Sequence, residues 1–137
     1  MCTIIIKTQD DLKKLLDEKG DIVIPANLNF INKIDIEIPG CIRTFSGWIN
    51  TAGGSIKCEE IDTVYDDNDS SIIYSSGDII TCGGNIYVKS LQCGGRLDTG
   101  GGDVYVEKDL DLGGNIRTAG GKIICKGSIN FSIRWGI

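Results

Sequence analysis

The chain has 137 residues and a net charge of −5, with six cysteines and no histidine. Its length fits one domain, and its apolar content of 41% fits an ordered core. No basic patch stands out to bind nucleic acid, no histidine or Cys-x-x-Cys pair indicates a zinc site, and no apolar run is long enough to span a membrane.

Residues 1–40 are predicted to form a strand-and-helix cap at one end of the domain, followed by the first coils. The segment 3–7 reads as a short strand, and a helix is predicted from Thr8 to Lys19. Its start resembles a capping box, with Asp11 in the third position, and three leucines fall on one face. Gly20 is expected to end it. Such a short helix persists only when docked, and its natural dock is the first layer of a stack of strands.

From residue 41 to residue 137, a double glycine keeps returning in the same setting. Each copy has an aliphatic residue, a threonine two positions later, Gly-Gly, and then a short alternating run. The last three of these threonines are 18 and 19 residues apart, and a period near 19 built from short strands and glycine turns is typical of a β-solenoid. The copies start at Ile49, Ile79, Leu97 and Ile116.

These observations predict a mainly β, single-domain parallel β-helix, or β-solenoid, of roughly six coils with a short N-terminal capping α-helix. We expect right-handed coils, as in most parallel crossovers. The second residue after each Gly-Gly pair, or the third where a further glycine follows, should point into the core. These inward residues are Ile56, Ile86, Val104 and Ile123.

The double glycines are interpreted as structural corners, because a tight corner needs a positive φ that glycine adopts without steric cost. A phosphate-binding loop needs a following helix, and calcium-binding nonapeptide repeats need a recurrent aspartate beside the glycines; neither pattern is present. The threonine column is interpreted as β-propensity beside the corner, with an outward hydroxyl ladder that orders water as the alternative. Its members are Thr51, Thr81, Thr99 and Thr118.

Two of the cysteines fall at equivalent positions of the repeat. Cys58 and Cys125 take the place that Val88 and Val106 have in the other copies, which predicts small core residues. A disulfide framework is the alternative. Because no signal peptide is apparent, we expect reduced thiols and a cytoplasmic protein.

An acidic segment at about 59–78 interrupts the repeat. It holds seven acids, and no Lys or Arg occurs between Lys57 and Lys89. The spacing from Thr51 to Thr81 is about 11 residues longer than the later spacings between threonines of the column, which indicates an insertion. One interpretation is a solvated loop, and the other is a recognition surface for a basic partner. The candidate partner-binding residues are Glu59, Glu60, Asp62, Asp66, Asp67 and Asp69.

The C-terminal segment is apolar and aromatic, with no helix or charge block to cover the last coil. A bare strand edge and an apolar patch are unfavourable in water. We therefore predict a homodimer through this end. The self-association residues are Phe131, Ile133, Trp135 and Ile137.

Two stretches of the repeat, Gly77 to Val88 and Gly113 to Ile123, resemble the coils of bactofilins, which are polymer-forming β-helical cytoskeletal proteins. The layout of the whole chain is similar to small phage-encoded and mobile-element proteins of Gram-positive bacteria, and Thr3 to Gly20 matches their strand-and-helix opening. The resemblance implies a phage accessory protein of the kind that inhibits host defence complexes, including CRISPR effectors. It assigns no functional residues.

The predicted function is non-enzymatic, because the acids of the regular coils form no repeated pair. No cofactor or metal is expected. The leading hypothesis is an inhibitor whose acidic segment occupies the basic channel of a host nucleic-acid-binding complex. The alternatives are a bactofilin-like scaffold that self-assembles through its ends, and a structural domain of a virion.

Overall fold

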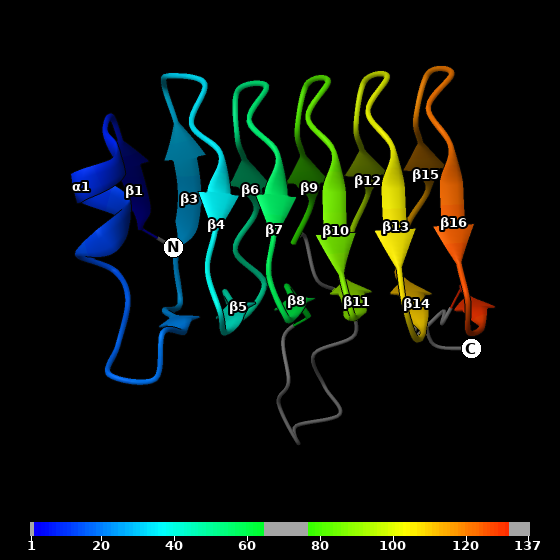
Figure 1. The fold of residues 1–137 in the computed structure, drawn as a ribbon, viewed down its shortest axis with the longest axis horizontal. Coiled ribbons are helices and arrows are strands. Elements are labelled where there is room, and N and C mark those ends of the chain that lie inside the picture. Colours follow the sequence, from blue (N-terminus) through cyan, green and yellow to red (C-terminus); the bar gives the residue numbers. More distant parts are fainter. Residues whose placement is uncertain (1, 65–76, 132–137) are drawn as a thin grey trace.

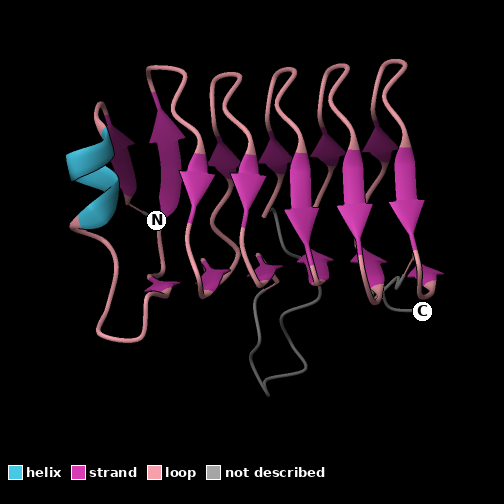
Figure 2. Ribbon diagram, in the orientation of Figure 1, coloured by secondary structure: helices cyan, strands magenta, loops and turns pink. Residues whose placement is uncertain are grey.

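The protein is a stack of parallel coils, seen side by side in the computed structural model, which describes residues 2–64 and 77–131 (Figure 1). Every strand pairing in the described chain is parallel and joins one coil to the next. The strands line up in three sheets, two of six strands and one of five (Figure 2). The structure therefore confirms the predicted parallel β-solenoid.

The three sheets are called A, B and C, and a complete coil visits them in the order A, C, B. Sheet A contains β1 (Thr3–Ile6), β3 (Asn27–Phe30), β6 (Ile49–Asn50), β9 (Ile79–Ile80), β12 (Leu97–Asp98) and β15 (Ile116–Arg117). Sheet C contains β4 (Ile36–Glu37), β7 (Ile56–Lys57), β10 (Ile86–Val88), β13 (Val104–Val106) and β16 (Ile123–Cys125). Sheet B contains β2 (Ile22–Val23), β5 (Cys41–Arg43), β8 (Glu60–Asp62), β11 (Ser90–Cys93), β14 (Leu110–Leu112) and β17 (Ile129–Asn130).

The coils wind with a right-handed sense. In Figure 1 the chain passes from left to right, rising along the more distant strands of sheet A and descending along the nearer strands of sheet C. This handedness is the one that right-twisted strands favour in parallel crossovers.

The core is made of columns of aliphatic side chains, one from each coil. Strand alternation sends every second side chain inward, and exact register stacks the equivalent residues. In sheet B one such column contains Ile22, Ile42, Ile61, Leu91 and Leu110, all fully buried. In sheet C the expected inward residues Ile56, Ile86 and Val104 are also fully buried, whereas Ile123 in the last coil is partly exposed.

The helix α1 (Gln9–Lys13) comes between β1 and β2 in the chain, where later coils have a strand of sheet C, and it lies at the end of the stack beside β1 (Figure 1). Thr8 is its N-cap and forms a full capping box with Asp11, as predicted. The helix is shorter than predicted, because its C-cap is Lys14. The Asp17 side chain accepts hydrogen bonds from two later backbone N–H groups and holds the following turn, so Gly20, with φ of +80°, shapes this turn rather than ending the helix.

The two glycines of each corner are required for different reasons. The first adopts a φ between +99° and +113°, directly after a residue that is itself in the left-handed region. In the corner with three glycines that preceding residue is Gly100, and the two corner glycines are Gly101 and Gly102. The second has no room for a Cβ: on Gly84 it would overlap the carbonyl oxygen of Gly54, and on Gly102 that of Gly84. The prediction of structural corners is consistent with this geometry, and coil stacking supplies the second requirement.

The threonine column closes the corners from inside. Thr81 and Thr99 are fully buried, and each hydroxyl donates to the carbonyl of the second glycine, 2.7 Å away in both cases. The alternative of an outward hydroxyl ladder is therefore wrong. Sequence reasoning identified the column but assigned it to β-propensity, whereas its members satisfy carbonyls that burial would otherwise leave unpaired.

The residue after each corner links one coil to the next. Its side chain accepts a hydrogen bond from the backbone N–H of the equivalent residue in the following coil. The successive bonds run from Ser55 N to Asp35 Oδ1, Asn85 N to Ser55 Oγ, Asp103 N to Asn85 Oδ1 and Lys122 N to Asp103 Oδ1, with lengths of 2.8 to 3.0 Å. An acid such as Asp103 therefore has a structural role here.

Candidate functional site

Three surfaces are candidates for function: the acidic segment, the exposed last coil and the outer face of sheet C. Of the six acids predicted to bind a partner, Glu59, Glu60 and Asp62 lie in the described chain. The other three, Asp66, Asp67 and Asp69, lie outside the described residues.

The described acids belong to a regular coil. Glu60 and Asp62 are in β8, which pairs in register with β5 and β11. The first part of the predicted 59–78 segment therefore lies in a regular coil, and residues 65–76 lie outside the described residues. The corner around this segment still closes, because the Thr63 hydroxyl donates to the Gly77 carbonyl, as the Thr44 hydroxyl donates to the Gly47 carbonyl one coil earlier.

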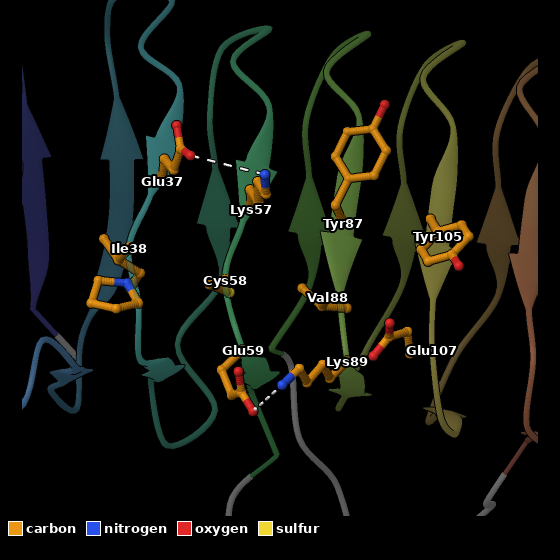
Figure 3. Close-up of a pocket in the computed structure, with 11 residues that line it drawn as sticks. Glu37, Ile38, Lys57, Cys58, Glu59, Tyr87, Val88, Lys89, Tyr105 and Glu107 are labelled. Atoms are coloured by element: carbon orange, nitrogen blue, oxygen red, sulfur yellow. Dashed lines mark ion pairs between the residues drawn. The ribbon is translucent and has the colours of Figure 1, made fainter.

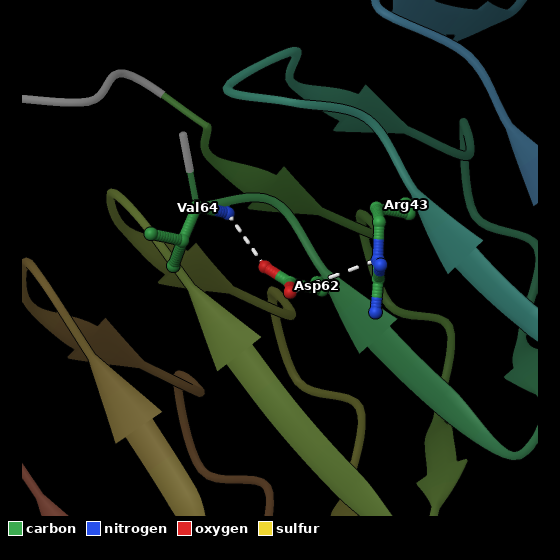
Figure 4. Close-up of polar contacts among 3 residues, drawn as sticks. All are labelled: Arg43, Asp62 and Val64. Atoms are coloured by element: carbon green, nitrogen blue, oxygen red, sulfur yellow. Dashed lines mark hydrogen bonds and ion pairs between the residues drawn. The ribbon is translucent and has the colours of Figure 1, made fainter. Parts of the chain in front are cut away.

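Asp62 lies at the end of β8, close to Val64 and to Arg43 of the preceding coil (Figure 4). Its carboxylate accepts a hydrogen bond of 2.9 Å from the Val64 N–H and lies 3.9 Å from the Arg43 guanidinium on the preceding coil. Its side chain is only 13% exposed. These contacts support a structural role and reduce the negative charge that Asp62 presents to solvent.

Glu59 is also balanced by a neighbouring cation. Its carboxylate lies 3.2 Å from the Lys89 ammonium on the next coil, and both side chains are about half exposed. An exposed pair of this kind contributes little to stability, at most about 1 kcal/mol, but it neutralises the local surface. The described part of the acidic segment is therefore less negative than the sequence alone indicates.

The last coil exposes side chains whose equivalents in other coils form the core. Ile129 is 47% exposed, whereas Leu110, at the equivalent position in the preceding coil, is fully buried. Phe131, which follows β17, is 54% exposed, and Ile123 in β16 is 38% exposed. These three side chains, named here the end patch, include one of the four predicted self-association residues. The others, Ile133, Trp135 and Ile137, lie outside the described residues.

The outer face of sheet C carries a shallow, open groove of about 510 Å³ (Figure 3). Tyr87 and Tyr105 stand next to each other on β10 and β13. Charged side chains of alternating sign flank them, and the Lys57 ammonium lies 4.0 Å from the Glu37 carboxylate. The Lys126 ammonium lies 5.6 Å from the centre of the Tyr105 ring, and hydrogen bonding to the Tyr105 side chain raises the pKa of Lys126.

Sequence reasoning did not identify this groove. Its signal was present, since a tyrosine stands between two inward residues in both Ile86-Tyr87-Val88 and Val104-Tyr105-Val106. The charged residues around the tyrosines come from coils separated by unequal lengths of chain, so their alignment required the observed register.

The buried cysteines, Cys58 and Cys93, are packing residues rather than nucleophiles, whereas Cys2 and Cys82 are exposed and Cys125, predicted as a core residue, is only partly buried. All six lie in the described chain and are free thiols. Cys58 is buried at the position equivalent to Val88, as predicted, and burial raises the pKa of its thiol to about 12. Burial likewise raises the pKa of Cys93 to about 11. Thiols with such pKa values are almost fully protonated at neutral pH and react poorly.

The described residues offer little to bind a metal. Residues 2–64 and 77–131 contain no group of three histidine, cysteine, aspartate or glutamate side chains placed to hold an ion. Within the same ranges, no buried side-chain nitrogen or oxygen lacks a hydrogen-bond partner. No described helix has the length and apolar character needed to cross a membrane.

The architecture defines the class of protein: a right-handed parallel β-solenoid with a helix over its first coil. The chain matches no protein-family profile, no curated protein and no solved structure. The functional assignment therefore rests on the three surfaces themselves.

Proposed function

We propose that this chain is a non-enzymatic protein that self-associates through its C-terminal coil. The observation that carries the proposal is the end patch, where three side chains continue buried core columns yet are 38% to 54% exposed. Contact with a second copy would remove this apolar surface from water, at a gain of about 25 cal/mol per Å² of apolar surface buried. It would also bring partners to the exposed edges of the last strands.

A closed dimer fits the geometry better than a filament. Head-to-tail growth requires that the last coil of one copy docks on the first coil of the next. The first coil is covered, because Leu12 of α1 is buried and packs with Ile6 in the same core cluster as the solenoid interior. The two C-terminal coils can instead meet each other, which uses the same patch twice and leaves no growing end.

The test is the molar mass in solution of wild-type protein and of Phe131→Ser. Light scattering is recorded at about 1 M NaCl, where the Debye length is about 3 Å, so that charge contacts are screened and apolar contacts persist. The wild type should be dimeric at concentrations on the order of 50 µM, and Phe131→Ser should be largely monomeric. Val23→Ser is the matched control, because Val23 is 50% exposed in β2, away from the last coil. A monomeric wild type would contradict the proposal.

A second candidate function is binding of a basic partner by the acidic segment, such as a host nucleic-acid-binding complex. The observation in its favour is the run of seven acids without a single Lys or Arg. Polylysine is a suitable probe. A variant with the six candidate acids replaced by Asn or Gln should bind it more weakly and with less dependence on salt than the wild type does. Equal affinity at low salt would rule this candidate out.

A further inference from the structure

The outer face of sheet C carries a row of charges that alternate in sign from coil to coil. The row contains Glu59, Lys89, Glu107 and Lys126. Backbone hydrogen bonds fix its alignment: Lys89 N donates to Glu59 O, Glu107 N to Val88 O and Lys126 N to Val106 O, at 2.9, 3.1 and 3.0 Å. The side chain of each member is therefore next to an opposite charge along the stack. This set is named the charge row.

A second row lies beside the first. Equivalent positions in the five successive strands of sheet C are occupied by Glu37, Lys57, Tyr87, Tyr105 and Ile124. Glu37 lies at the outer edge of the face, and the other four residues form the row. Tyr87 and Ile124 are 41% and 48% exposed. The two tyrosines thus form an aromatic centre on the face, with a lysine on one side and an isoleucine on the other. This set is named the tyrosine row.

If either row is turned end to end and placed against a copy of itself, each side chain meets an opposite charge or a compatible neutral group. We infer that the outer face of sheet C binds the same face of a second copy, with the two solenoids antiparallel. A two-fold axis along the strand direction, passing between β10 and β13, keeps each row facing its own counterpart and reverses the order of the coils. Lys89 then faces Glu107 of the second copy, and Glu59 faces Lys126 of the second copy.

The same operation matches the tyrosine row. Tyr87 faces Tyr105 of the second copy, which allows offset or edge-to-face packing of the rings. Lys57 faces Ile124 of the second copy, so its aliphatic stem can cover the isoleucine while the ammonium stays in water. None of the pairs in the two rows brings like charges together.

Alternating charge is the argument for this occupant. A nucleic acid, or a peptide of one charge sign, would meet a repelling side chain at every second coil. The reversed copy instead places an opposite charge against all four members of the charge row. The two tyrosines could also stack on a sugar ring, and the experiment distinguishes this occupant from a second copy.

The contact is expected to be weak. The axis pairs only four strands, β7, β10, β13 and β16. Their spacing of about 4.8 Å gives a contact roughly 14 Å long, and each strand has only two or three residues. An interface of this size is at or below the low end for specific complexes, so association should depend on concentration and on salt. The interface does not depend on the end patch. Where both contacts form, they alternate along an open chain of copies.

The experiment exchanges the central charges in a Phe131→Ser background, which removes the end patch from the measurement. At low salt, the parent should dimerise at high protein concentration. Lys89→Glu and Glu107→Lys should each shift its dissociation constant at least tenfold toward monomer, because each places like charges opposite one another twice per dimer. Lys19→Glu, in the turn after α1, is the control and should leave the dissociation constant within about twofold.

Mixing distinguishes the interface from a loss of stability. Lys89→Glu and Glu107→Lys protein, combined in equal amounts, should form a heterodimer, because each position 89 then faces an opposite charge at position 107. The double variant should dimerise by itself for the same reason. Circular dichroism and thermal melting establish that each variant is folded.

Two results would overturn the inference. One is folded single variants that fail to associate when mixed. The other is a parent that stays monomeric at low salt at every concentration reached. If the tyrosine fluorescence of that monomeric parent changes with a glucose oligomer, the face belongs to a glycan. Failure here leaves the end-patch measurement at high salt unaffected, so the two proposals are separately testable.

Discussion

The two ends of the solenoid have equivalent core columns but differ in what covers them. At the first coil, Ile6 and Ile22 are fully buried, and Leu12 of α1 is nearly so. At the last coil, Ile129 and Phe131 are about half exposed. The repeat therefore supplies an inward-facing side chain in each coil, but burial of that side chain depends on the next layer. The inward side chains of a coil are buried only when another coil or a helix covers them.

The covering layer at the first coil is small. The helix α1 has five residues, too few to be stable alone in water. Its capping box sets where it begins, and the packing of Leu12, with partial burial of Leu15 and Leu16, holds it against the strands. The difference between the ends therefore rests on a few apolar contacts, and three comparisons between variants probe it.

Leu12→Ala is expected to have the largest effect, because it removes the buried contact of the covering helix. The free energy of unfolding should fall by about 2–4 kcal/mol, as for other buried leucines. The measurement is urea denaturation followed by circular dichroism. Lys13→Ala, at the exposed neighbouring position, should cost less than about 0.5 kcal/mol. If Leu12→Ala also lowered the free energy of unfolding by less than about 0.5 kcal/mol, α1 would not protect the first coil.

Loss of the threonine hydroxyl should cost more inside the stack than at its last coil. Thr99→Val leaves the Gly102 carbonyl without its donor in a fully buried corner and should cost about 1–2 kcal/mol. Thr118→Val removes the equivalent bond, of 2.8 Å, to Gly121 in the last coil. That corner is only partly buried, so water can replace the donor, and we expect about half the cost. Equal costs by urea denaturation would show that the two corners are equally protected.

The smallest effect concerns the pH dependence of the covering helix. Hydrogen bonds from the Lys7 and Thr8 backbone N–H groups lower the pKa of Asp11. A lowered pKa in the folded state stabilises the protein above the unfolded value, near 4, and this stabilisation is lost as the pH falls through the folded pKa. Asp11→Asn should therefore reduce the loss of stability between about pH 5 and pH 2, measured by thermal melting. Asp10→Asn, in the same turn, is the control. An unchanged acid profile for Asp11→Asn would contradict this role of Asp11.

The sequence predicted the architecture because its strongest signal, the double glycine, is a local requirement of the corner. It predicted too long a helix, because Leu15 and Leu16 continue the helical spacing although they lie in the turn that follows α1. The candidate site was harder to predict. Glu59 and Asp62 looked like free acids until the register placed Lys89 and Arg43 beside them.

The corner between sheets B and A is a suitable site for inserting a foreign segment into this protein. The same threonine-to-glycine hydrogen bond closes it whether the two residues are three positions apart, as in Thr44 and Gly47, or fourteen positions apart, as in Thr63 and Gly77. The free-energy cost of loop closure rises slowly, by about 0.6 kcal/mol for each doubling of the loop length. A peptide epitope or a small folded module could therefore be grafted there in place of residues 65–76, and the solenoid would display it from a fixed point on a rigid rod.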